Sequence, residues 1–595
     1  MEKINPQKQS ELYIICAGSR QELLEKLKVL IKFLELGNAA LADASGLLSS
    51  SIKKGQECLS IVCTSADELR KKSAYAVQKL AEIDCSRIYE KSGIYYFGEK
   101  LAQKGKLAFL FPGEGSQYQN MLCELSLYFP EVRRSFEIAD AACSAVDGFL
   151  PSQYIFPAKD RENELEQELW KMEGAVEAVV SANYAMMMLL KKLKIIPDCL
   201  VGHSSGEFTA LEQAQVIQFE DERSRIEYIR EGYVLMKELT AQTDIPEGIL
   251  VAIGAVKRKE IESAIKEISS PIFIAMENCS HQYVLCGCRD SIEKIVALLS
   301  KQGAICNILP FNRPYHTAWF EQALKPLKNF FDRHEVFAPK IEIYSCATVA
   351  PYPTDPKQIR SVATGQWAMP VRFQETIETI YENGVRVLIE VGPRGNLTGF
   401  VDNILKDKAH IAVPLDKIHH SGIAQLNHAL GLLAAAGVEM ELDYFYSRKP
   451  LTFLDRIDAR EEGNRHTIPS MRLAGMSFKS EFSQKLHLST SESKPTIAVL
   501  EGTASVKEKG SSQEVLDSYF KTMENFVAVS SDIMHAYLEG EMPQMQAGQE
   551  KAAAGIMPHK FPLLGEILEL KASESLIAMR EFTLEEDLFL KDHTF

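Results

Sequence analysis

Short apolar runs alternate with amphipathic stretches over the first 100 residues of the chain. The run LYIIC at 12–16 predicts a strand, and the spacing of apolar residues from Arg20 to Leu36 predicts a helix. A second strand is expected at 58–65, followed by a helix that begins near Ala66 with Ser65 as its N-cap. Residues 1–100 therefore form a predicted small α/β unit.

A larger α/β domain is predicted over residues 101–430. The apolar run LAFLF, which continues into FPGEGSQ, indicates a buried strand that ends in a glycine-rich turn. One long helix is expected over 165–193, and a short strand over 199–201. Repeated strand and helix patterns of this kind are typical of an α/β fold.

An inserted module is predicted within this domain, at residues 249–313. Its pattern is strand, helix, strand, strand, helix, strand. This order is the split βαβ arrangement of ferredoxin-like folds. The pattern of the larger domain resumes after it, and residues 431–486 follow as a linker.

The character of the chain changes in its last part. Residues 487–513 are rich in Ser, Thr, Lys and Glu, and they predict a flexible linker, which with an amphipathic helix extends to 555. A final apolar segment follows, at 556–595.

Composition and charge exclude several classes of function. The 595 residues carry a net charge of −15, which argues against nucleic acid or an anionic membrane as the main partner. The N-terminus has no apolar signal region and no apolar run reaches transmembrane length, so we expect a cytoplasmic protein. Most of the 12 cysteines are expected to be reduced, buried thiols, and Cys286 and Cys288 lack a second ligand pair for a metal.

The strongest chemical signal is Gly-x-Ser-x-Gly at 202–206. It stands between a predicted strand and a predicted helix, which is the setting of a nucleophile elbow that exposes Ser204. The alternative interpretation is an ordinary Gly/Ser turn. A serine nucleophile needs a base, and His316 is a candidate because the chain returns there from the inserted module to the main domain. By itself, a lone histidine is more often structural.

Four motifs in order carry a resemblance to a known family. They are FPGEGSQ at 111–117, GHSSGE at 202–207, PYHT at 314–317 and EVGP at 390–393. Over about residues 106–430 the chain resembles the malonyl-CoA:acyl carrier protein acyltransferase family, in particular the acyltransferase domains of modular (type I) polyketide and fatty acid synthases. The resemblance implies an α/β-hydrolase-like subdomain with a ferredoxin-like insert.

The resemblance also implies roles for individual residues. Ser204 would be the nucleophile and His316 its general base and acid, with the backbone N–H groups of Glu114 and Ser205 as the oxyanion hole. Arg230 would bind the free carboxylate of a malonyl group.

Arg223 and Arg225 are nearby alternatives to Arg230. Asn278 matches an asparagine near the active site of the family, and Gln117 and His203, which lie in its motifs, are counted with the substrate-binding residues.

Three departures from the family pattern stand out. Many members have Gln where Glu114 stands, a frequent Thr-Gln-Pro is replaced near 175–177, and residues 313–315 match neither familiar signature for malonyl or methylmalonyl. The acyl group therefore stays open at this point.

The flanking segments extend the resemblance. Residues 1–100 resemble the linker between a ketosynthase and its acyltransferase, and 431–486 resemble the linker that follows the acyltransferase. Residues 556–595 resemble the start of a hot-dog dehydratase, with Asp592 and His593 at the position of its catalytic turn. We expect no dehydratase activity from this segment, and the alternative is a strand pair packed on the acyltransferase.

The predicted reaction moves a malonyl-type acyl group from coenzyme A to the phosphopantetheine thiol of an acyl carrier protein. It needs no metal and no permanently bound cofactor. Ketosynthase and dehydratase domains of a parent synthase are the other expected partners, whether the chain is a natural subunit or an excised piece. A thioesterase with the same elbow and a non-catalytic scaffold are the alternatives.

Overall fold

The computed structural model describes residues 10–35, 49–147, 150–241, 245–310, 313–447, 566–571 and 575–579. The chain divides into two units, Met1–Ser483 and Gln484–Phe595.

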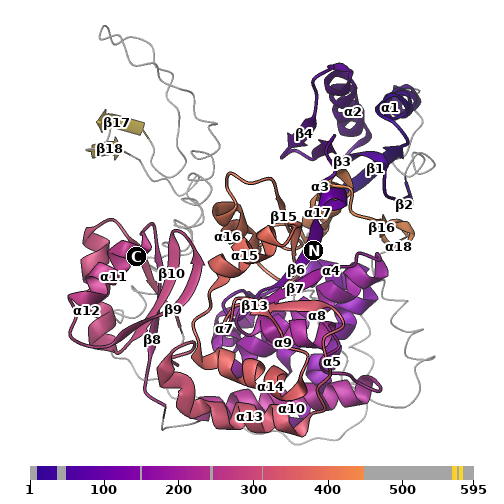
Figure 1. The fold of residues 1–595 in the computed structure, drawn as a ribbon. Helices are drawn as coiled ribbons and strands as arrows, with labels where there is room; N and C mark the ends of the chain where they lie inside the picture. Colours follow the sequence, from indigo (N-terminus) through magenta and orange to yellow (C-terminus); the bar gives the residue numbers. More distant parts are fainter. Residues whose placement is uncertain are drawn as a thin grey trace, which may run out of the picture. The chain divides into compact units, whose positions relative to one another are not determined.

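The N-terminal part of the first unit is an antiparallel sheet in the order β1-β3-β5-β4 (Figure 1). Its elements are β1 (Glu11–Ala17), α1 (Arg20–Glu35), β2 (Ser51–Ile52), β3 (Glu57–Cys63), α2 (Ala66–Ala81), β4 (Arg87–Glu90), β5 (Ile94–Phe97) and α3 (Leu101–Lys104). Ser65 caps α2, as the sequence predicts, by accepting a hydrogen bond from Glu68 N–H at 3.2 Å.

Both faces of this small sheet are buried. Tyr13 and Ile15 of β1 pack in the same apolar cluster as Leu23 of α1 and Leu69 of α2. The alternate side chains of β1, such as Ile14, belong to the main core, as do those of α17 (Gly422–Ala435), which contacts β1, β3 and β5. The small unit is thereby packed against the main domain.

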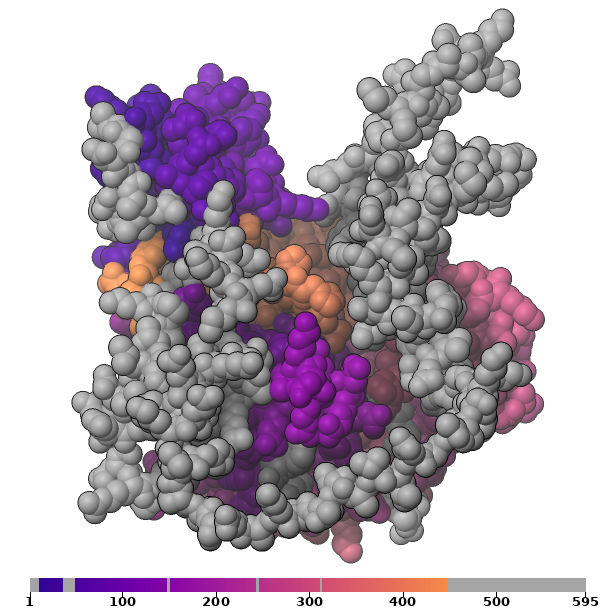
Figure 2. Space-filling model, turned by 180° about the vertical axis from the view of Figure 1, so that it is seen from behind, coloured from indigo at the N-terminus to yellow at the C-terminus, as the bar shows by residue number. Residues whose placement is uncertain are grey.

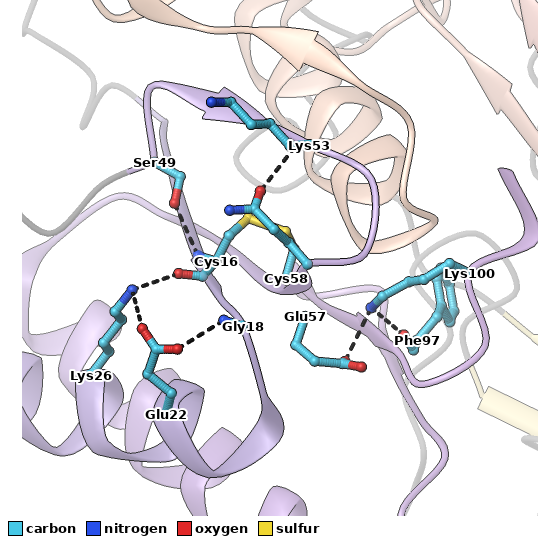
Figure 3. The surroundings of a disulfide bond; sticks show 11 residues. Cys16, Gly18, Glu22, Lys26, Ser49, Lys53, Glu57, Cys58, Phe97 and Lys100 are labelled. Atoms are coloured by element: carbon cyan, nitrogen blue, oxygen red, sulfur yellow. Dashed lines mark hydrogen bonds and ion pairs between the residues drawn. A yellow bond between two sulfur atoms is a disulfide. The ribbon is translucent and has the colours of Figure 1, made fainter. Parts of the chain in front are cut away.

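A disulfide bond joins Cys16 and Cys58 in this sheet (Figure 3). The two residues stand directly opposite each other on β1 and β3, with their Cα atoms 4.2 Å apart. This pair is the exception to the prediction that most of the cysteines are reduced, because the pairing register of two strands cannot be read from cysteine spacing. The other ten cysteines are free thiols.

The main domain is built on a six-stranded sheet in the order β13-β12-β7-β6-β14-β15. The strands are β6 (Lys106–Phe111), β7 (Cys199–Gly202), β12 (Glu342–Ser345), β13 (Ala350–Pro351), β14 (Val385–Glu390) and β15 (Ile411–Pro414). All pairs are parallel except β12 with β13. The continuous apolar run of β6 is explained by this setting, since five of its six residues are buried between helical layers.

The helices of the main domain follow the strands in sequence. They are α4 (Cys123–Tyr128), α5 (Pro130–Asp147), α6 (Pro151–Ile155), α7 (Glu162–Trp170), α8 (Met172–Lys192), α9 (Gly206–Gln213), α10 (Glu222–Ala241), α13 (Leu324–Arg333), α14 (Pro356–Gly365), α15 (Phe373–Glu382), α16 (Asn396–Ile404) and α17, with the short 3₁₀ helices η2 (Lys159–Arg161), η3 (Ala318–Ala323) and η4 (Gln366–Ala368). After α17 come β16 (Met440–Glu441), which pairs with β2, and α18 (Asp443–Tyr446).

The prediction of one helix over 165–193 is wrong, because the chain breaks between α7 and α8. Lys171 is extended (φ −66°, ψ 145°) and ends one helix before the next begins. Gly174 permits the close approach of the two helices, since a Cβ there would lie 2.3 Å from the carbonyl oxygen of Glu168.

The inserted module comprises β8 (Ile249–Gly254), α11 (Arg258–Lys266), β9 (Ile272–Cys279), β10 (Gln282–Gly287), α12 (Arg289–Lys301) and β11 (Ile305–Ile308). Its strands form a separate antiparallel sheet in the order β11-β8-β10-β9 (Figure 1). Atoms of this module form the pink part of the surface in Figure 2. Two backbone hydrogen bonds connect β9 to Val371 of the main domain, at 2.8 and 2.9 Å.

In the second unit the structure describes one antiparallel pair, β17 (Glu566–Lys571) with β18 (Ser575–Met579). The predicted linker and amphipathic helix at 487–555 lie outside the described residues, and so do Asp592 and His593. Within the described ranges, no helix combines the length and the apolar character that crossing a membrane requires.

Candidate active site

The turn between β7 and α9 carries Ser204 in a tight elbow. A Cβ at Gly202 would lie 2.3 Å from Glu207 N, and a Cβ at Gly206 would lie 2.1 Å from Phe111 O. Both positions therefore require glycine, because the strand, the turn and β6 approach too closely for any side chain. Ser204 itself has φ of +53°, the left-handed backbone of a nucleophile elbow.

Ser204 and His316 lie within hydrogen-bonding distance although 112 positions separate them in the sequence. The Ser204 Oγ and the His316 Nε2 are 2.7 Å apart, and both residues are buried. This is the geometry in which an imidazole can remove the proton of a serine hydroxyl.

Two backbone carbonyls orient the His316 ring. Its Nδ1 lies 3.1 Å from Gln366 O and 3.2 Å from Met369 O. Because carbonyls only accept hydrogen bonds, Nδ1 carries the proton and Nε2 is left as the acceptor for Ser204. Burial lowers the pKa of His316 to about 4, so the ring is neutral near pH 7 and its Nε2 is free to accept a proton.

Gln366 and Met369 are not among the residues that the sequence predicts for the site. Their contribution comes from main-chain oxygens in and after η4, and Trp367 between them also accepts a hydrogen bond from His316 N–H at 2.8 Å. A backbone acceptor can belong to any residue type, so no motif in this segment could have indicated the role.

The glycine-rich turn after β6 runs beside the elbow. Glu114 N–H donates to the Ser205 Oγ at 3.0 Å, and a Cβ at Gly113 would lie 3.2 Å from the Ser204 Cβ. The Asn183 side chain of α8 holds this turn by donating to Pro112 O at 2.9 Å. The main chain at 113–114 therefore lies directly against the nucleophile.

Gln117 and the pair His203–Asn278 make hydrogen bonds within the glycine-rich turn and at the elbow. The Gln117 side chain is buried and accepts a hydrogen bond from Gly115 N–H at 2.8 Å. His203 Nε2 and Asn278 Oδ1 are 2.7 Å apart, so the elbow is joined to β9 of the inserted module. These contacts are between protein groups, and they fit positioning roles for the three side chains.

The buried carboxyl of Glu207 holds the first turn of α9, directly after the elbow. It accepts hydrogen bonds from Ser345 Oγ at 2.9 Å and from the Tyr352 hydroxyl. Burial raises the pKa of Glu207 to about 7. The helix that begins at the nucleophile is thus connected to β12 and to the segment that follows β13.

Arg230 lies on α10, and among the described residues no hydrogen bond or ion pair joins it to Ser204 or His316. Its guanidinium pairs with Glu227 on α10, and it lines a cavity of about 770 Å³ together with Lys325 and Arg333 of α13. Neither Ser204 nor His316 lines this cavity.

The two alternative arginines lie in different settings. Arg223 is exposed. Arg225 is buried, pairs with Glu212 at 2.8 Å and stacks on the ring of Tyr184. That set of contacts fits a structural role for Arg225.

Fold and site together define a mixed α/β protein with a serine–histidine pair at a strand–turn–helix elbow. Within the described residues, no group of three or more His, Cys, Asp or Glu side chains is arranged to hold a metal ion. The chain belongs to the acyl transferase domain family, whose sequence profile matches residues 108–439, and it is an acyltransferase.

Similar proteins agree with this assignment. The chain is 29% identical over 309 residues to the malonyl CoA-acyl carrier protein transacylase of Bacillus subtilis, a match that covers 52% of this chain and 93% of that protein. It is 27% identical over 365 residues to one of the polyunsaturated fatty acid synthase subunits of a Thraustochytrium species, a match that covers 59% of this chain. The same match spans only 12% of the synthase protein.

Solved structures share the fold. The acyl transferase domain of ZmaA has a TM-score of 0.58 at 22% identity, over 75% of this chain and 98% of that domain. The acyltransferase domain from module 8 of the salinomycin polyketide synthase has a TM-score of 0.60 at 17% identity, over 74% of this chain and 99% of that domain. At these identities the similarity establishes the fold alone.

Proposed function

We propose that this chain transfers a malonyl-type acyl group from coenzyme A to the phosphopantetheine thiol of an acyl carrier protein, through an ester on Ser204. The observation that carries the proposal is the 2.7 Å contact between Ser204 Oγ and His316 Nε2, with Nδ1 turned to two carbonyls. The transacylase relatives support the malonyl group and the carrier protein.

In the first half-reaction the Ser204 oxygen attacks the thioester carbonyl while His316 Nε2 takes its proton. The backbone N–H groups of Glu114 and Ser205 stabilise the tetrahedral oxyanion. Glu114 N–H faces the Ser205 hydroxyl in this structure, so the substrate oxygen has to share or replace that contact. Breakdown of the intermediate releases the thiolate of coenzyme A, which receives the proton from His316.

In the second half-reaction the carrier thiol attacks the acyl-serine, and His316 removes the thiol proton. The same two N–H groups hold the second oxyanion, and the proton returns to Ser204 Oγ when the ester bond breaks. No step needs a group beyond the protein and its two substrates.

The flanking assignments are part of the proposal. We infer a hydrolase-like main domain with a ferredoxin-like insert, a ketosynthase linker at 1–100 and the start of a dehydratase at 556–595. The sheet orders of the two modules support the first part, and similarity to a fatty acid synthase protein supports a multidomain setting. Ketosynthase and dehydratase domains are the partners that this setting implies, in the cytoplasm.

Intact-mass spectrometry after mixing with malonyl-CoA tests the proposal. The wild-type protein should gain the mass of one malonyl group, and a carrier protein with its phosphopantetheine arm should remove it. The Ser204→Ala variant should gain nothing and unfold at the same temperature to within a few degrees, since the side chain lost is a single hydroxyl. Ser224→Ala, which removes a hydroxyl that bonds only within its own turn to Asp221, is the matched control and should acylate normally.

The other outcomes identify the alternatives. Steady release of coenzyme A without an adduct and without a carrier would indicate a thioesterase, with water as the acceptor. No reaction with any acyl-CoA would indicate a scaffold. An adduct on Ser204→Ala would place the nucleophile elsewhere.

A further inference from the structure

Glu114 places an ionisable side chain at the edge of the proposed oxyanion hole. Its backbone N–H contacts Ser205, and the preceding residue, Gly113, packs against Ser204. The backbone at Gly113 and Glu114 is thus fixed against Ser204 and Ser205, so the Glu114 side chain begins next to the nucleophile.

The Glu114 carboxyl has no hydrogen-bond partner at one of its oxygens. Oε1 is buried, and no donor within the described residues reaches it. A buried carboxyl oxygen without a donor is costly, so in a folded protein it calls for an explanation such as a functional role. Because this oxygen lies near the reacting Ser204, the acyl group that is bound there is the candidate to interact with it.

The charged groups around this carboxyl come from two segments. Glu173, in the first turn of α8, acts on Glu114 through its negative charge. From the segment before His316, Tyr315 interacts electrostatically with Glu114, and Arg313 acts in turn on Tyr315. The Arg313 guanidinium is engaged with Thr240 O. The charge that acts on the Glu114 carboxyl is thus negative, that of Glu173.

We propose that the Glu114 carboxyl sorts the acyl groups that reach Ser204 by their charge. A malonyl group carries a carboxylate, which an ionised Glu114 repels and a neutral Glu114 binds by donating a hydrogen bond. An acetyl group carries no charge and is indifferent to this state. The inference rests on the proposed acyl transfer and adds a selectivity residue to it.

The protonation state of Glu114 sets the pH range of this effect. Burial, and then the charge of Glu173, raises the pKa of Glu114 from its usual 4.5 to about 8. The carboxyl is therefore neutral near pH 7 and becomes charged above pH 8. His316 has a pKa of about 4, so its ring stays neutral over this whole range and contributes no competing titration.

The test measures single-turnover acylation of Ser204 by malonyl-CoA and by acetyl-CoA between pH 6.5 and 9. With a pKa of about 8, about one tenth of Glu114 is still protonated at pH 9, so the malonyl-to-acetyl rate ratio should fall about tenfold. In Glu114→Gln, which keeps the shape and a donor, the ratio should not change with pH. The exposed Glu220→Gln is the matched control and should keep the wild-type profile.

A flat ratio in the wild type, or a ratio that still falls in Glu114→Gln, would overturn the assignment of selectivity to Glu114. Both results leave acyl transfer by Ser204 intact. Failure of the proposed function has a different signature, namely no acylation by either acyl-CoA at any pH. The two failures are therefore distinguishable in one set of measurements.

Discussion

Ser204 and His316 both project from left-handed backbone, with φ of +53° and +60°. Neither residue type prefers this region, and holding it costs of order 1 kcal/mol or more at each position. The surroundings enforce it: β6 closes on the elbow, and η4 accepts a hydrogen bond from His316 N–H. This left-handed backbone conformation directs the two side chains toward each other.

Arg230 is the residue whose predicted role the geometry supports least directly, since it pairs with Glu227. If it binds the malonyl carboxylate, Arg230→Ala should slow malonyl loading about 10- to 100-fold relative to acetyl, the value of a charge-assisted hydrogen bond. Rates of adduct formation with both acyl-CoAs check this. Equal slowing of both would make Arg230 structural.

If Arg230 is structural, the Arg225→Ala variant should be tested for malonyl and acetyl loading in the same way. Arg225 is buried against Glu212 and Tyr184, so its loss should mainly lower the free energy of unfolding, and a selective loss of malonyl loading there would move the carboxylate site.

At the scale of elements, the N-terminal sheet is reinforced by its disulfide. The bond closes a loop between positions 42 residues apart on neighbouring strands. Lys26 also donates to Cys16 O at 2.9 Å, and the buried Lys100 pairs with Glu57 beside Cys58 (Figure 3). The ends of β1 and β3 are thus connected to α1 and to the segment before α3.

Reduction of this bond should destabilise the N-terminal sheet by about 2–4 kcal/mol, because the unfolded chain regains the freedom of the closed loop. Hydrogen exchange of the β1 and β3 amides, with and without reductant, measures the change. Cys63→Ala, which removes a buried free thiol from the same strand, is the control and should not alter the response to reductant. Protection that reductant leaves unchanged would contradict a stabilising bond.

At the scale of the whole molecule, buried carboxyls and histidines have opposite effects on how the free energy of unfolding changes with pH. Burial raises the pKa of several carboxyls, among them those of Asp140, to about 6, and of Glu177, Glu207 and Glu390, to about 7. A raised carboxyl pKa means that the folded state binds the proton more tightly than the unfolded state does. The stability from these groups is present below about pH 4 and is lost as the pH rises through 7.

Three histidines, two of them buried and one half-buried, act in the opposite direction. Burial lowers the pKa of His203, and it lowers those of His316 and His428 to about 4. Their contribution is present above the usual value of 6.5 and is lost as the pH falls toward 4.

Above about pH 6.5 the histidine contribution is complete while the carboxyls still lose their protons, so stability should decrease from about pH 6.5 toward pH 8. Thermal unfolding midpoints across pH 4.5–8.5 measure the profile. Glu390→Gln should make the alkaline decrease shallower, since it removes one of the groups that lose a bound proton. Midpoints that rise steadily from pH 6 to 8 would contradict this account.

Local sequence determined much of this protein. The buried strand β6, the elbow glycines and the Ser65 cap all follow from patterns within about ten residues, because period, turn chemistry and capping are local physics. The positions of Ser204 and His316 were also evident, although His316 needed the family resemblance to rank above other histidines.

Tertiary structure alone decided the rest. The 2.7 Å contact between Ser204 and His316 spans 112 residues, and the carbonyls that orient His316 belong to the backbone of η4 and the residue after it. The disulfide depends on strand register, and the break between α7 and α8 depends on two helices that pack too closely for a side chain at Gly174. In each case the deciding contact joins atoms that the chain brings together only by folding, so no local pattern encodes it.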